Sequence, residues 1–315
     1  MRGPHLRLIL LLLALVLAPL GARAAEPVST VSYRLDYGGW YTVPVMVNGR
    51  GPYDFIIDTG ASHSIVFGNL HAIQNFAPTG GPPQRVLGLA ASGRFPTYHI
   101  GEIALGTARL SGVVTVVLDE WKVGDEAPFG VLGLDFLSEY FVIVDRARSE
   151  VRLYDEDEPL ELAGRKWKWT SLTRRDFGLA DAGLYTVDGY VNNRLVRFMI
   201  DLGATGTIIN GKAKGKIEKA GGFSIVSNPV SGSTGSRVKG ALNERAEQQP
   251  MRVERIRLGR TTWYKEIVYV HDAPVFDELG VQNDAFGLLG ADLFHERSFA
   301  FDFKGGRLWI GPKGK

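Results

Sequence analysis

An internal duplication constrains this chain more than any other feature of its sequence. Residues 41–62 begin with YTVPVMVNG and end with FIIDTGAS, and residues 185–205 repeat the pattern as YTVDGYVNN and FMIDLGAT. Val, Ile, Tyr and Phe dominate both copies, and Asn or Gly interrupts them, which predicts two strands joined by a hairpin in each half. We therefore expect two similar β units within one chain.

A second pair of motifs supports the duplication. GVLGLDFL at 130–137 matches GLLGADLF at 287–294. Asp145 and Asp302 follow these motifs at the same distance along the sequence, so the two halves stay aligned as far as the strands that end each of them. The two halves thus share a skeleton and differ in the length of the segments between their motifs.

An acidic run, Tyr154–Pro159, offers the best boundary between the halves, because consecutive acids ending in proline suit neither a strand nor a core. We expect a first lobe at 25–156 and a second at 157–315, both all-β. The 39 glycines suit the many tight turns of such a fold. Short helices are predicted at three places: Leu134–Tyr140, Lys212–Lys219 and Ala291–Arg297.

Residues 1–24 have the layout of a secretory signal peptide. Two arginines precede an apolar run at Leu8–Leu17, and a small-x-small cleavage site follows at Ala22–Ala24. We expect export to a bacterial periplasm or the exterior, with no stable membrane association after cleavage. The alternative, an uncleaved membrane anchor, is disfavoured because the apolar run is short for a bilayer span.

Composition excludes several classes of function. The chain has no cysteine, which excludes thiol catalysis and a cysteine-ligated metal. Removing residues 1–24 takes away three arginines and no acid, so the formal charge moves from +2 to −1 and nucleic acid is not expected as a partner. The six histidines show no metal-ligand spacing, and we expect no metal and no cofactor. Two lobes in one chain predict a monomer.

Asp-Thr-Gly-Ala-Ser after an apolar strand, followed downstream by two apolar residues and glycine, resembles the pepsin and retropepsin superfamily of aspartic peptidases. The resemblance covers nearly all of the chain after residue 24. It implies two β-barrel lobes with the active site between them, each catalytic aspartate at the tip of a sharp loop. It assigns catalysis to Asp58 and Asp201, and supporting roles in the two loops to Thr59, Gly60, Leu202 and Gly203. It also assigns packing against these loops to the apolar-Gly pairs Leu132-Gly133 and Leu289-Gly290.

The chemistry of such a pair follows from physical principles. Each aspartate ends an apolar run, so its carboxyl should be half-buried, and two adjacent carboxyls cannot both ionise easily and share a proton. One then acts as base on a water while the other donates a proton to the scissile carbonyl. The predicted function is an endopeptidase that takes an extended polypeptide as substrate.

The motifs depart from the family at two points. Leu202 stands where the first motif has Thr59, so one of two hydroxyl cross-links between the loops is missing. Ala61 and Ala204 stand where pepsin-like members often carry a hydroxyl that lowers the aspartate pKa, which predicts an only mildly acidic pH optimum. The alternative function is a non-catalytic peptide-binding protein of the same fold, disabled by Leu202. For either Asp-x-Gly alone, a plain turn is the competing interpretation.

Two glycine-rich segments between the motifs are candidate flaps over a substrate cleft. They are Leu87–Gly93 in the first half and Ser231–Ser236 in the second. Their small residues would permit motion and close approach to an extended peptide. For the second segment, a plain loop is the alternative.

Overall fold

The computed structural model describes residues 25–36, 38–89, 91–120, 127–155, 159, 162, 166–177, 183–226, 236–239 and 245–314, with the backbone alone at 236–239 and 245–247. The predicted signal peptide and most of the second candidate flap lie outside these residues. So do three residues of the proposed boundary, 156–158, and the division into 25–156 and 157–315 stays a prediction.

The first half forms a closed β-barrel. Strand β3 pairs with β4 on one side and with β9 on the other, so the sheet curls back on itself. The eight strands lie in the order β2 (Arg34–Leu35), β3 (Tyr41–Val47), β4 (Arg50–Ile57), β11 (Gly130–Leu132), β5 (Ile65–Phe67), β10 (Ala108–Leu118), β9 (Thr97–Leu105) and β6 (Ala77–Pro78).

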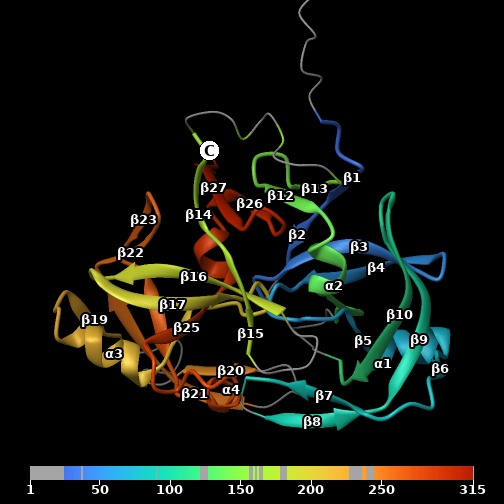
Figure 1. Ribbon diagram of the computed structural model, residues 1–315, viewed down its shortest axis with the longest axis horizontal. Helices are drawn as coiled ribbons and strands as arrows, with labels where there is room; N and C mark the ends of the chain where they lie inside the picture. The colour runs from blue at the N-terminus through green and yellow to red at the C-terminus, as the bar shows by residue number, and fades with distance from the viewer. Residues whose placement is uncertain are drawn as a thin grey trace, which may run out of the picture.

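The second half repeats the central strands of the first in a larger sheet. Its main path runs β19 (Phe223–Ile225), β21 (Arg245–Val253), β24 (Ile267–Val270), β18 (Ile208–Ile209), β25 (Phe286–Leu289), β17 (Arg194–Ile200), β16 (Gly183–Val191), β22 (Arg255–Leu258) and β23 (Thr261–Tyr264). Two further strands, β15 (Thr173–Asp176) and β20 (Ser236–Lys239), pair with β16 and β21. The all-β, two-lobed architecture expected from the duplication is confirmed (Figure 1).

A third sheet joins the two halves, and the sequence did not predict it. Its strands lie in the order β1 (Ser29–Ser32), β13 (Glu150–Tyr154), β12 (Phe141–Asp145), β26 (Arg297–Asp302), β27 (Arg307–Lys313) and β14 (Lys168–Ser171). The first three strands come from the first half of the chain and the last three from the second. The halves meet where β12 pairs with β26, the two strands that follow the second motifs, and Figure 1 shows this sheet above both lobes.

Matching hairpins carry the two Asp-x-Gly motifs. Asn48 and Gly49 turn β3 into β4, and Asn192 and Asn193 turn β16 into β17. All four residues have positive φ, which the two-residue turns of β-hairpins require and which Asn and Gly adopt most readily. The two predicted hairpins are therefore confirmed.

Helices are short, as predicted, but their bounds differ. Helix α2 covers Leu134–Leu137, the 3₁₀ helix η2 covers Ala291–Phe294, and α3 covers Gly211–Glu218. The first two end before Tyr140 and Arg297, the predicted ends, and short turns lead from them into β12 at Phe141 and β26 at Arg297. Two further helices were not predicted, α1 (Gly68–Gln74) and α4 (Pro274–Glu278). None of the helices in the described ranges has the length and apolar content that a membrane crossing requires.

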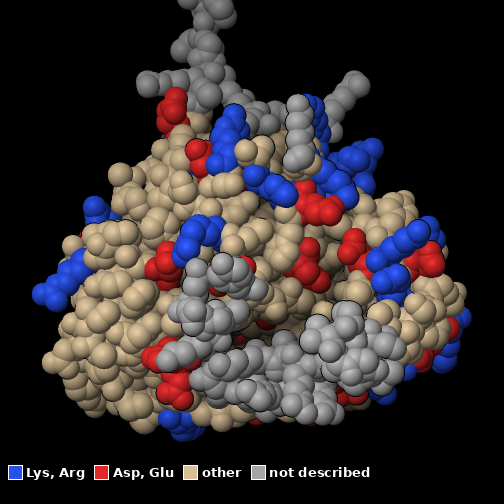
Figure 2. Space-filling model, turned by 180° about the vertical axis from the view of Figure 1, so that it is seen from behind, with Lys and Arg blue, Asp and Glu red and all other residues tan. Residues whose placement is uncertain are grey.

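Charges of both signs are interspersed on one face of the molecule. Figure 2 shows Lys and Arg lying beside Asp and Glu on the face that it presents. The surface ion pairs include Arg34 with Asp54 and Lys313 with Glu296. Exposed pairs of this kind contribute little to stability, so the fold depends on its apolar core.

Aromatic packing ties the joining sheet to the first barrel. Phe299 on β26 is fully buried, and its ring centroid lies 5.4 Å from that of Tyr41 on β3 and 4.7 Å from that of Phe294. Edge-to-face and tilted rings at such separations add to the burial of apolar area. Phe299 thus holds elements of both halves in one core.

We predict that Phe299→Ala lowers the free energy of unfolding by about 3–5 kcal/mol, because it leaves a cavity where the two halves meet. Urea unfolding followed by circular dichroism measures the change. Tyr264→Ala is the control, since Tyr264 is 68% exposed and its removal should change stability by less than about 0.5 kcal/mol. Equal losses in the two variants would contradict this account of the core.

Candidate active site

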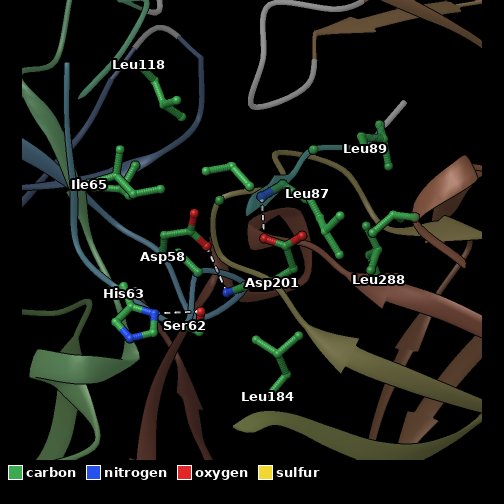
Figure 3. Close-up of a pocket in the computed structure, with 18 of the residues that line it drawn as sticks. Asp58, Ser62, His63, Ile65, Leu87, Leu89, Leu118, Leu184, Asp201 and Leu288 are labelled. Atoms are coloured by element: carbon green, nitrogen blue, oxygen red, sulfur yellow. Dashed lines mark hydrogen bonds between the residues drawn. The ribbon is translucent and has the colours of Figure 1, made fainter. Parts of the chain in front are cut away.

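The loops that carry Asp58 and Asp201 meet face to face between the lobes. Asp58 follows β4, and Asp201 follows the equivalent strand β17. A Cβ atom on Gly60 would lie 2.6 Å from Cγ of Asp201, and one on Gly203 would lie 2.5 Å from Oδ2 of Asp58. Each carboxyl therefore occupies space that only a glycine in the opposite loop leaves free. Figure 3 shows the two side chains next to each other in the cleft.

Backbone amides orient both carboxyls. The Gly60 N–H donates to Oδ1 of Asp58 at 2.8 Å, and the Ala204 N–H donates to Oδ1 of Asp201 at 3.0 Å. The structure thus brings together the two aspartates to which the resemblance assigned catalysis, each oriented by a backbone amide of its own loop.

The apolar-Gly strands pack through the loops, as the resemblance implied. Residues 130–132 run parallel to 55–57, and residues 286–289 run parallel to 197–200. The Asp58 N–H donates to the Leu132 carbonyl at 3.0 Å, and the Asp201 N–H donates to the Leu289 carbonyl at 3.1 Å.

The glycines that follow these strands have no room for a side chain. A Cβ atom on Gly133 would lie 2.5 Å from the carbonyl carbon of His63, and one on Gly290 would lie 2.5 Å from that of Gly206. The predicted packing residues therefore lie where the resemblance placed them.

A buried Ser/Thr–Asp pair braces each loop, and the sequence analysis missed both pairs. Ser64 donates through its hydroxyl to Asp135 at 2.7 Å, and Thr207 donates to Asp292 at 2.8 Å. The same two hydroxyls accept from the N–H groups of the glycines at 133 and 290. Both members of each pair occur at equivalent positions in the two motifs, so a closer comparison of the repeats would have found them.

Thr59 is the hydroxyl cross-link between the loops. It is fully buried, donates to the Ile200 carbonyl at 3.1 Å and accepts from the Leu202 N–H at 3.1 Å. Leu202, at the equivalent position of the second loop, has no hydroxyl and cannot form the reciprocal pair of hydrogen bonds. Its side chain is fully buried. The predicted asymmetry is therefore present: one cross-link is polar and the other is replaced by apolar packing.

Trp40 supplies a second polar link across the lobes. Its indole Nε1–H donates to the Gly203 carbonyl at 2.7 Å, so a first-lobe side chain holds the second-lobe loop directly. Trp40 was not among the site residues expected from the sequence. No sequence signal marks this bond, because it depends on how the two lobes meet.

Burial raises the pKa of both central carboxyls, and the charge of Asp58 raises that of Asp201 further. For Asp58 the largest cause is desolvation, opposed by hydrogen bonds from backbone amides. For Asp201 desolvation and the negative charge of Asp58 together raise the pKa to about 8. Burial also raises the pKa of Asp292 to about 6. Two adjacent acids with raised pKa values retain one proton between them near neutral pH.

The carboxyl pair opens into a cavity of about 1280 Å³ between the lobes. Apolar side chains of both lobes line it, including Ile65, Val116, Ile208, Tyr269 and Leu288. Among the described residues no cluster of three or more His, Cys, Asp and Glu side chains could hold a metal ion. A cavity lined by apolar side chains together with polar and charged groups is typical of a ligand-binding site.

A hairpin of the first lobe lines this cavity. Strands β7 (Gln84–Leu87) and β8 (Ser92–Phe95) pair with each other and with no other described strand, and the Gly88 N–H donates to the Ala91 carbonyl. Leu87 and Leu89 line the cavity (Figure 3). The hairpin predicted around 87–93 is confirmed, and its motion as a flap stays a prediction. In the second lobe β20 and β21 form a hairpin just after the segment predicted there.

Comparison with known proteins agrees with this geometry. The family model for aspartyl proteases matches the chain twice, at residues 43–136 and 187–293, once in each half. The chain belongs to the aspartyl protease family.

Among solved structures, the fold of this family member is similar to that of an aspartic proteinase from Irpex lacteus. The TM-score is 0.55 and the sequence identity 14%, over 90% of this chain and 97% of the other. At this identity the likeness shows the pepsin-like fold alone. No curated protein matches the chain in a sequence search.

We predict that Thr59→Val lowers the free energy of unfolding by about 2–4 kcal/mol, because it leaves a buried N–H and a buried carbonyl without partners. Thr59→Ser keeps the hydroxyl and should lose only about 1 kcal/mol, the contribution of one buried methyl group. Denaturant titration of both variants measures the difference. A Val variant as stable as the Ser variant would show that the cross-link does not hold the loops.

We predict that Asp201→Asn stabilises the protein increasingly as pH rises. A raised pKa means that the native carboxyl pair keeps a proton which the unfolded chain loses, so the stability of the wild type falls between the ordinary value of 3.8 and about 8. The stability difference between variant and wild type should grow by roughly 1–3 kcal/mol from about pH 4 to 8. Unfolding titrations at several pH values measure it, with Asp188→Asn, on the exposed part of β16, as control. A difference that does not change with pH would contradict the raised pKa.

Proposed function

We propose that this chain is an aspartic endopeptidase in which Asp58 and Asp201 form one catalytic dyad. The observation that carries the proposal is the contact of each carboxyl with the glycine of the opposite loop, at the base of a cleft between the lobes. Membership of the aspartyl protease family supports a hydrolase, and a polypeptide is the substrate that such a cleft accommodates.

The proposed reaction needs one proton shared by the dyad. The ionised carboxyl takes a proton from a bound water as its oxygen attacks the scissile carbonyl carbon, and the protonated carboxyl donates to the carbonyl oxygen. In the second step the carboxyl that took the water proton donates it to the amide nitrogen as the C–N bond breaks. The other carboxyl takes a proton from a hydroxyl of the tetrahedral intermediate as the new carboxyl product forms, which restores the shared proton. The buried pair favours this state, since its second ionisation is opposed by the first.

The asymmetry at Leu202 is compatible with catalysis in this proposal. Thr59 still supplies both hydrogen bonds of one cross-link, and Trp40 adds a bond to the second loop. Together these bonds tie the loop that carries Asp201 to the first lobe. They therefore favour a retained site over a disabled one.

Cleavage of an unfolded protein tests the proposal. We expect Asp58→Asn and Asp201→Asn each to lose about 10³-fold or more in kcat/KM, because neither remaining carboxyl can supply base and acid alone. Asp54→Asn, an exposed change four residues before Asp58, should keep its activity. If only substitution of Asp58 abolished activity, the active site would instead be formed by the first lobes of two chains. An inactive wild type would favour the peptide-binding alternative.

The pH dependence of kcat/KM follows from the raised pKa values. Activity should fall as pH rises through about 8, where the shared proton is lost, and should fall on the acid side when the second carboxyl is protonated. We expect an optimum between about pH 5 and 7. A maximum below about pH 3, where even ordinary carboxyls are protonated, would contradict this assignment.

A further inference from the structure

We propose that the ion pair between Arg85 and Glu278 is a latch that holds the β7–β8 hairpin across the cleft, which makes Arg85 a positioning residue for substrate binding. The inference rests on the proposed function only in taking the cleft as the place where a polypeptide binds. Its structural part can be tested without any catalysis.

The ion pair connects the two lobes across the cavity. Nη2 of Arg85, on β7, lies 2.6 Å from Oε1 of Glu278, the last residue of α4, although the residues are 193 positions apart in the sequence. Arg85 itself lines the cavity, and so do Val275 and Leu279 next to Glu278. Among the described strands β7 pairs only with β8, so lifting the hairpin from the cleft breaks this contact with the other lobe.

The charges of the hairpin favour such a contact. Arg85 lies directly opposite Arg94 in the register of β7 and β8. Like charges facing each other across a strand pair are unfavourable, and a carboxylate from outside the hairpin relieves the repulsion. Arg94 has no ion pair within the described part of the chain, so Glu278 compensates only one of the two arginines.

Glu278 is poorly placed within its own helix, which favours a role for its contact with the hairpin. A carboxylate at the last residue of a helix faces the negative end of the helix dipole, so it does not stabilise α4. Its close partner on the hairpin gives it a favourable interaction instead. The acid is therefore explained by what it binds across the cleft.

The latch is weak enough to open. The side chains of Arg85 and Glu278 are 44% and 37% exposed, and pairs exposed to this degree change an equilibrium by a small factor. We expect the pair to favour the closed hairpin by about twofold to fivefold, which corresponds to about 0.4–1 kcal/mol. Salt should reduce the effect because water and ions reach the pair.

Spectroscopy of the spin-labelled protein tests the latch directly. The chain has no cysteine, so labels can be placed at Ser92→Cys on β8 and at Lys216→Cys on α3, both exposed, without other reactive thiols. We expect electron–electron distance measurements to give a narrow distribution in the otherwise unchanged protein. Arg85→Gln or Glu278→Gln should broaden it toward longer distances. Arg94→Gln removes the same charge from the same hairpin and should leave it narrow.

Kinetics then separates a positioning role from a structural one. Arg85→Gln and Glu278→Gln should raise KM for a peptide substrate by about twofold to fivefold with little change in kcat, and Arg85→Glu with Glu278→Arg together should restore it. An Arg85→Gln protein with the distance distribution of the unchanged protein would overturn the latch, whether or not the enzyme is active. An inactive protein whose distribution still responds to these substitutions would overturn the proposed function and leave the latch standing.

Discussion

The contact of two carboxyls across the lobe interface is the constraint on which the rest of the structure depends. Asp58 and Asp201 each take the space that a glycine of the opposite loop leaves open. Burial raises the pKa of both acids and the charge of Asp58 raises that of Asp201 further, while backbone amides and a shared proton stabilise the pair. The site is therefore a property of the interface and of neither lobe alone.

Several interactions fix the interface around this pair. The joining sheet pairs β12 with β26, and the hydroxyl of Thr59 and the indole of Trp40 cross between the loops. His295 adds a contact of the same kind, with Nε2 2.9 Å from the Gly39 carbonyl. The two halves contribute different links, so the two aspartates lie at equivalent positions but are held by different interactions. The hairpin over the cleft adds a weaker contact, which suits a part that has to open.

The sequence could predict what repeats in it. The hairpins before Asp58 and Asp201 and the packing of Gly133 and Gly290 follow from local chemistry that occurs twice. The joining sheet, the bond from Trp40 and the ion pair of Arg85 were not predictable, because each depends on how the lobes meet and no local pattern encodes that. The ends of α2 and η2 were predicted too late in the chain, because no Gly or Pro marks a stop between these short helices and the turns that follow them. Export rests on residues 1–24 alone and stays a prediction.

As a catalytic dyad, Asp58 and Asp201 must titrate as one unit, and a titration of their carboxyls distinguishes such a unit from two independent acids. Carbon-13 NMR of Asp-labelled protein, with Asp58→Asn and Asp201→Asn used for assignment, follows each carboxyl from about pH 3 to 9. The account predicts two coupled steps, the upper one near the value of about 8 raised by burial and by the neighbouring charge, and the loss of that step in either variant. Two independent titrations near pH 4, each unaffected by substitution of the other aspartate, would contradict it.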